Sequence, residues 1–248
     1  MQTLNLMIDA GKGSRIERGQ LATVITPAPT QTWFPIPHAK LVDGVQQSLV
    51  RSGLRIVAEA HGLSHEGSRY FGMFQVANGH THEDYSLIVG LRNSHDKKFP
   101  AGLVVGSGVF VCDNPAFSGE IEIGRKHTRF INRDLPQLIE SAVGRLGNMR
   151  RSQEQRIEAY KGKTLSDAKV HDILIQSLDA RVVPASKIPA VLQEWRNPRH
   201  EEFAARKNGW RLFNSYTEVL KGSNIFERPR TTQALHGLMD TACGVLVN

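Results

Sequence analysis

The sequence contains little cysteine and no long apolar run. Only Cys112 and Cys243 occur in 248 residues, each beside apolar neighbours, so we expect two buried thiols in a reducing compartment and no disulfide framework. No stretch of about 18 apolar residues is present, and the first residues include no apolar segment typical of a secretion signal. These absences predict a cytoplasmic protein with no membrane partner.

Internal repeats and low-complexity tracts are also missing. Apolar residues make up 40% of the chain and charged residues 22%, which is the composition of an ordinary globular protein and excludes disorder of the whole chain. A chain of 248 residues is long enough for one large domain, or for a core with an appendage, that buries its own hydrophobic interior.

The spacing of apolar residues changes once along the chain. It favours a short helix and then strands up to about residue 128, and from Asp134 it follows the three- and four-residue steps of helices. Strands before helices, without alternation, predict an α+β fold: an antiparallel β-meander flanked by a short N-terminal helix and a long basic helix, followed by a helical C-terminal region. The expected domains are an extended arm (1–30), an α+β core (31–163) and the helical region (164–248).

The expected elements have the following ranges. A helix over 39–52 is followed by strands over 54–63, 69–77, 86–94, 102–114 and 119–128, and by a helix over 134–163 that is interrupted near Gly144 and Gly147. Further helices are expected over 166–179, 186–195, 208–220 and 231–239.

Positive charge is in excess and is concentrated in one segment. The formal net charge is +7, from 31 basic and 24 acidic residues, which favours polyanionic partners. Residues 125–163 contain ten basic and four acidic residues, so this segment carries most of the excess. On the predicted long helix, Arg145, Arg156 and Lys163 share a face away from the apolar stripe. The pattern fits either a groove that follows a phosphate backbone or a solvated helix face.

A second basic group lies at a predicted turn, where Lys97 and Lys98 precede Phe99. Cations beside an aromatic ring combine phosphate contact with base stacking, and Tyr70 is a further candidate for stacking. The candidate residues for binding nucleic acid are Arg92, Lys97, Lys98, Phe99, Arg125, Lys126, Arg129, Arg133, Arg150 and Arg151.

Catalytic chemistry has weaker support. A metal site built from His80, His82, His95 and Asp96 has workable ligand types, but His80 and His82 fall in a polar loop. Asn93 to Asp96 is more simply a turn that presents the two lysines. The run from Gly106 to Gly108 lacks the full nucleophile-elbow pattern and falls inside a strand. We therefore expect no cofactor and lean against an enzyme.

The middle of the chain resembles a known family. The runs LRNSHD (Leu91 to Asp96), GVFVCDN (Gly108 to Asn114) and GEI (Gly119 to Ile121) are similar to the bacterial "phage/plasmid-like protein" family, a domain of unknown function carried by phages, plasmids and prophages. This resemblance implies an origin in a mobile element and no established activity. The predicted topology alone also resembles the core of single-strand annealing recombinases, which form rings or filaments and hold single-stranded DNA in a cationic groove between sheet and helix.

These observations lead to one main hypothesis and two alternatives. The main hypothesis is a non-catalytic protein of a phage or mobile element, in the cytoplasm of a bacterial host, that binds single-stranded DNA, or RNA by the same chemistry. It would anneal complementary strands during recombination and form a homo-oligomer, as a ring or filament. The alternatives are a metal-dependent nuclease or hydrolase that uses His80, His82, His95 and Asp96, and an anti-defence factor that binds a host protein.

Overall fold

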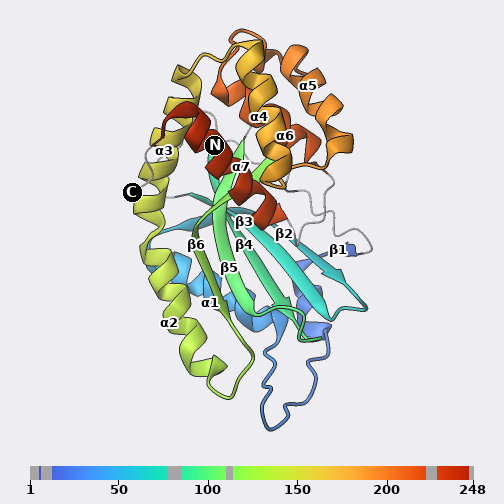
Figure 1. Cartoon of the computed structure of the whole chain (residues 1–248). Coiled ribbons are helices and arrows are strands. Elements are labelled where there is room, and N and C mark those ends of the chain that lie inside the picture. Colours follow the sequence, from blue (N-terminus) through green and yellow to red (C-terminus); the bar gives the residue numbers. More distant parts are fainter. Residues whose placement is uncertain (1–5, 7–12, 78–84, 110–113, 222–227, 246–248) are drawn as a thin grey trace.

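Figure 1 shows the computed structural model of the chain, which describes residues 6, 13–77, 85–109, 114–221 and 228–245. Six strands form one antiparallel sheet whose spatial order is the order of the sequence. The strands are β1 (Ser14–Ile16), β2 (Arg55–Ser64), β3 (Arg69–Ala77), β4 (Tyr85–Ser94), β5 (Ala101–Val109) and β6 (Asn114–Arg125). The predicted α+β class and β-meander are confirmed.

Two helices cover one face of the sheet. Helix α1 (His38–Arg51) and helix α2 (Ile131–Gly144) contact each other and lie over the strands. Leu41 and Val45 of α1 and Ile139 of α2 join Phe74 and Leu91 of the strands in one buried core. Because strand side chains alternate between faces, these positions follow directly from the period-two pattern of the strands.

A second core joins the other end of the sheet to the helical C-terminal region. Here helices α3 (Leu146–Gly162), α4 (Asp167–Asp179), α5 (Ile188–Arg196), α6 (Gly209–Val219) and α7 (Arg228–Cys243) surround buried aromatic side chains. Short 3-10 turns, η2 (Ala185–Lys187) and η3 (Glu201–Phe203), connect some of them. None of the helices in the described part of the chain combines the length and the apolar character needed to cross a membrane.

Helix α7 packs against the outer strand of the sheet. Thr232 Oγ1 accepts a hydrogen bond from the backbone N–H of Phe117 in β6 at 2.9 Å and lies 3.1 Å from the Phe117 carbonyl oxygen. An edge strand has backbone groups that no further strand satisfies. At Phe117 a side chain from the C-terminal helix supplies the missing partner.

The structure differs from the sequence prediction at several boundaries. The long helix is broken at Arg145, close to the expected interruption. Strand β6 begins at Asn114, whereas the prediction left residues 115–118 outside the strands. Strand β1 and the 3-10 helix η1 (Arg18–Thr23) were not predicted. Strand β1 was missed because three residues are too few to show the alternating pattern of a strand. Cys243 is buried as expected, and burial raises the pKa of its thiol to about 11, whereas Cys112 lies outside the described residues.

Candidate nucleic-acid interface

Three segments that are distant in sequence meet at one end of the sheet. They are the segment that enters α1, the turn between β4 and β5, and the connection from β6 to α2. Phe34 N–H donates to the carbonyl oxygen of His127 at 2.8 Å. The carbonyl oxygen of Ile36 accepts from Asn93 Nδ2 at 3.0 Å and lies 2.9 Å from His95 Nε2. These bonds fix the basic residues of the last two segments beside each other.

The β4–β5 turn presents Lys97 and Lys98, as predicted, although β4 continues through Ser94. Asp96 accepts hydrogen bonds from Arg69 Nε at 2.6 Å and from the backbone N–H of Lys98 at 3.1 Å. Burial would raise the pKa of Asp96, but the hydrogen bonds from Arg69 and Lys98 outweigh it and hold this pKa below its usual value. Lys97 has a φ of +64°, and its Nζ lies 5.0 Å above the centre of the Trp33 ring.

The connection from β6 to α2 presents a second aromatic ring among cations. Phe130 is 39% exposed. The guanidinium groups of Arg129 and Arg133 lie 4.6 and 4.4 Å from the centre of its ring. Lys126, at the start of the connection, is also exposed. We call Lys97, Lys98, Lys126, Arg129 and Arg133 the basic rim.

The two acidic residues near the basic rim are both held in ion pairs. Asp96 pairs with Arg69, and Asp134 accepts from Arg133 Nε at 2.7 Å and from Arg125 at 2.7 Å. Hydrogen bonds from Arg133 and Arg125 lower the pKa of Asp134. Residues 94–100 and 125–134 together contain six basic and two acidic residues. These two segments therefore carry a surplus of four positive charges.

Other predicted residues are not part of the basic rim. Arg92 pairs with Glu122 at 3.0 Å, and its guanidinium lies 6.0 Å from the centre of the Phe99 ring. Arg150 and Arg151 lie in α3, where they bond to Glu154 and Asn148 respectively. At 1.5 Å per helical residue they are about 25 Å further along the helices than Arg133. The predicted set therefore divides between the rim and two other places.

Two sequence interpretations are wrong because packing against other parts of the chain covers the side chain. Tyr70 is fully buried in an inner strand and bonds to His61 Nδ1 at 2.9 Å, so it is not exposed for stacking. Arg156 is only 3% exposed and pairs with Asp240 of α7 at 2.8 Å. Arg156, the central residue of the expected basic face, therefore makes a structural contact and is not exposed.

Sequence reasoning missed the two rim aromatics, Trp33 and Phe130. Phe130 could have been identified from the sequence, because it is an aromatic residue within the basic segment from Arg125 to Arg133. Trp33 had no such clue, because its contact with Lys97 joins segments 64 positions apart.

Buried histidines lie directly beneath the rim. The rings of His38 and His95 stack with centres 4.0 Å apart, and the His127 ring centre lies 6.3 Å from that of Trp33. Asn93 Nδ2 donates to His38 Nδ1 at 2.9 Å, so His38 is neutral and protonated on Nε2. Burial lowers the pKa of both His38 and His127 to about 4, and it lowers that of His95 as well.

The candidate catalytic residues do not form a centre in the described part of the chain. His80 and His82 lie outside it, His95 is buried against His38, and Asp96 is engaged with Arg69. No group of three or more side chains suited to hold a metal occurs among the described residues. Ser107 is a buried strand residue whose hydroxyl accepts from Gln153 at 2.9 Å, which agrees with a packing role for the run from Gly106 to Gly108.

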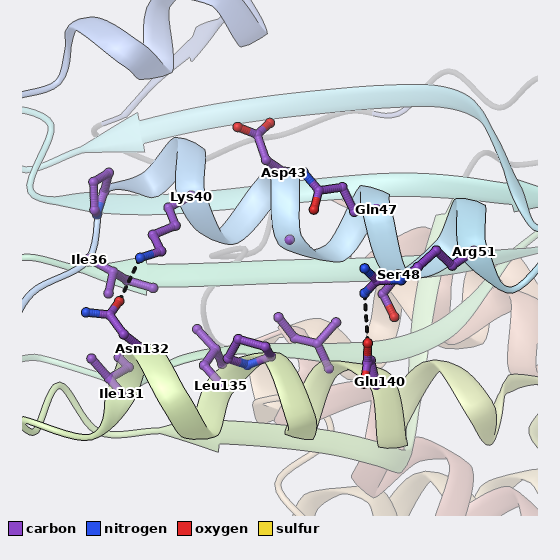
Figure 2. Close-up of a pocket in the computed structure, with 14 residues that line it drawn as sticks. Ile36, Lys40, Asp43, Gln47, Ser48, Arg51, Ile131, Asn132, Leu135 and Glu140 are labelled. Carbon is purple, nitrogen blue, oxygen red and sulfur yellow. Dashed lines mark hydrogen bonds and ion pairs between the residues drawn. The ribbon is translucent and has the colours of Figure 1, made fainter.

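A groove of about 660 Å³ runs between α1 and α2 (Figure 2). Its walls include Leu135 and Ile139. Two exposed contacts cross it, from Lys40 Nζ to Asn132 Oδ1 and from Arg51 to Glu140, both at 2.8 Å. Its charged lining residues are Lys40, Asp43, Arg51 and Glu140. The groove is therefore balanced in charge, unlike the rim.

Comparison of the chain with protein-family models, curated proteins and solved structures finds no match. The resemblance to the phage/plasmid-like family and the analogy with annealing recombinases therefore stay predictions. The alternatives of a metal-dependent hydrolase and an anti-defence factor stay predictions in the same way.

Proposed function

We propose that the protein binds single-stranded nucleic acid, with DNA as the first candidate, along the basic rim. The observation that carries this proposal is the pairing of cations with rings at one end of the sheet, where Lys97 lies over Trp33 and two arginines flank the exposed Phe130. Single strands are held by cations that contact phosphates and by aromatic faces on which bases stack. Both kinds of group are present in segments that contact one another through Trp33, Phe34 and His127.

The conformation of Lys97 adds support to this proposal. A lysine with a φ of +64° occupies a region that costs side-chain-bearing residues about 1 kcal/mol or more. The surrounding hydrogen bonds of Ser94 and Asp96 hold the turn in place. This fixed turn holds the exposed Lys97 in one place, where its cation is available to a phosphate.

The wider hypothesis is a strand-annealing protein of a phage or mobile element. It is supported by the order of helix, antiparallel meander and helix, which is an analogy of fold, and by the charge surplus at the sheet end. An annealing assay with two complementary labelled oligonucleotides tests it. Faster duplex formation with the protein than without it is the expected result.

Binding itself is tested by the fluorescence anisotropy of a labelled single-stranded oligonucleotide at several salt concentrations. The double variant Lys97→Glu, Lys98→Glu removes two phosphate contacts, so the log-log salt slope should become shallower by about 1.4 and the affinity should fall. A double variant of two exposed lysines in the helical region, Lys169→Glu with Lys187→Glu, makes the same change in net charge and serves as the control. No binding at low salt, or an equal loss in both double variants, would refute the proposal.

Stacking is tested separately at Phe130. The variant Phe130→Leu keeps apolar contact with the neighbouring arginine side chains but removes the ring. We expect the oligonucleotide to bind more weakly by about 1–3 kcal/mol, with an unchanged salt slope, because no phosphate contact is lost. Unchanged affinity would remove Phe130 from the interface.

A further inference from the structure

A proline-containing loop projects from the same end of the molecule. Residues 24–32, which we call the proline loop, connect η1 to the segment that enters α1, and Figure 1 shows this connection extending beyond the end of the sheet. Ile25 is 89% exposed, more than any other large apolar side chain of the described residues. The loop contains no charged residue. Its far end is closed by hydrogen bonds between Thr30 and Trp33, at 2.8 and 3.1 Å.

The α1–α2 groove and the proline loop match in chemistry. The groove is balanced in charge and the loop is uncharged, so the groove suits the loop better than it suits a polyanion. Helical walls offer few free backbone partners, because their N–H and C=O groups bond within each helix. Pro27 and Pro29 have no N–H groups, so this segment enters such a groove with fewer unsatisfied donors than an ordinary peptide.

We infer that residues 25–29 of one copy occupy the α1–α2 groove of a second copy. The lengths agree: Lys40 and Arg51, at the two ends of the groove, are about 16 Å apart along α1, and five residues in a polyproline conformation also span about 16 Å. The two contacts that cross the groove are exposed and contribute little stability. They therefore open, or close over the loop, at small cost.

The buried area favours a reciprocal exchange between two copies. Five extended residues expose about 700 Å², so one loop in one groove buries about 1,400 Å² at most when both partners are counted. Stable interfaces bury about 1,200–2,000 Å², which puts one junction near the lower limit. The loop and the groove lie at the same end of the folded molecule. Two copies related by a two-fold axis therefore form two such junctions at once.

The test measures mass in solution by light scattering after nuclease treatment, at micromolar concentration. The wild-type chain should be a dimer. Ile25→Asp, which places a charge on the loop, and Gly44→Phe, which fills the groove, should both be monomers. A Cβ at Gly44 meets only Ile139 Cδ1, at 3.8 Å, and loss of a helix glycine favours folding. Ile175→Asp, at an exposed isoleucine of α4, is the matched control and should remain dimeric.

Mixing the two monomeric variants gives the sharpest result. Ile25→Asp retains an intact groove and Gly44→Phe retains an intact loop, so their mixture should form a one-to-one heterodimer through a single junction. A monomeric wild type, a dimer that persists in both variants, or a mixture that stays monomeric would overturn the inference. The inference is independent of nucleic-acid binding, so the Lys97→Glu, Lys98→Glu variant should dimerise normally. If Gly44→Phe instead weakens oligonucleotide binding and leaves the mass unchanged, the groove belongs to the nucleic acid and the inference is wrong.

Discussion

Acidification should destabilise this fold through the histidines beneath the basic rim. Burial lowers the pKa of His38 and His127 from 6.5 to about 4, and it lowers the pKa of His95 and His61 in the same direction. In the unfolded chain these rings are solvated and titrate near 6.5. Between pH 6.5 and 4 the unfolded state therefore binds more protons than the folded state. The free energy of unfolding reaches its full value above pH 6.5 and falls as the pH falls through this window.

The magnitude follows from the size of the shift. One histidine that moves from 6.5 to about 4 contributes about 2 kcal/mol to the loss of stability between pH 7 and pH 4.5. His38 contributes an amount of the same order, but the charge of His127 is one cause of its shift, so the two contributions do not simply add. Domains of this kind have a total stability of about 5–15 kcal/mol. Mild acid should therefore remove a large part of the stability of the fold.

The variant His127→Phe isolates one of these contributions. Neither ring nitrogen of His127 meets the geometry of a hydrogen bond among the described residues, and a contact with the Phe34 backbone has only a minor effect on its pKa. Phenylalanine therefore removes a titratable group at little cost in hydrogen bonding. In urea unfolding series at pH 7 and pH 4.5, the variant should lose about 2 kcal/mol less than the wild type. His171→Phe, at an exposed histidine of α4, controls for the substitution itself. Stability that is flat from pH 7 to 4.5, or a His127→Phe profile equal to the wild type, would refute this reasoning.

Two further predictions concern the framework. Asp240→Asn leaves the buried guanidinium of Arg156 without its carboxylate. In urea unfolding, the free energy of unfolding should fall by about 3–5 kcal/mol. A loss below 1 kcal/mol would mean that the pair is not buried as described. Gly102→Ala places a Cβ against the carbonyl oxygen of Ile123 in β6 and should cost about 2–3 kcal/mol. Gly237→Ala, where a Cβ meets nothing within 4 Å in α7, should instead stabilise by about 0.5–1 kcal/mol. Thermal melts that shift both glycine variants in the same direction would contradict this contrast.

Local patterns were sufficient to predict most of the architecture. The β-rich runs of β2 to β5 and the four-residue spacing of Leu41, Val45 and Leu49 each indicate one element. Short connections between successive strands make a meander the simplest order. Strand β1 was missed because three residues show no period, and its pairing of Ser14 with Leu63 depends on a partner far along the chain.

The candidate site was predictable only in part, for the same physical reason. Lys97 and Lys98 were identified because a turn can be recognised from its own residues. The ring beneath Lys97 is supplied by Trp33, and the acid that pairs with Arg156 is supplied by Asp240. Such contacts depend on tertiary packing between segments that sequence spacing does not relate. Charge clustering therefore located the rim but did not separate its exposed cations from structural arginines.

The contact between α7 and β6 has a consequence for how the chain is made. A ribosome completes all six strands of the sheet before it adds the residue that bonds to Phe117, namely Thr232, which lies 115 positions later. At a synthesis rate of about 5–20 residues per second, this edge stays uncovered for about 6–23 seconds. During that interval a nascent chain exposes strand edge that neighbouring chains on the same message are able to pair with. Premature stop codons ahead of Thr232 should accordingly yield insoluble protein and little soluble, partly folded product.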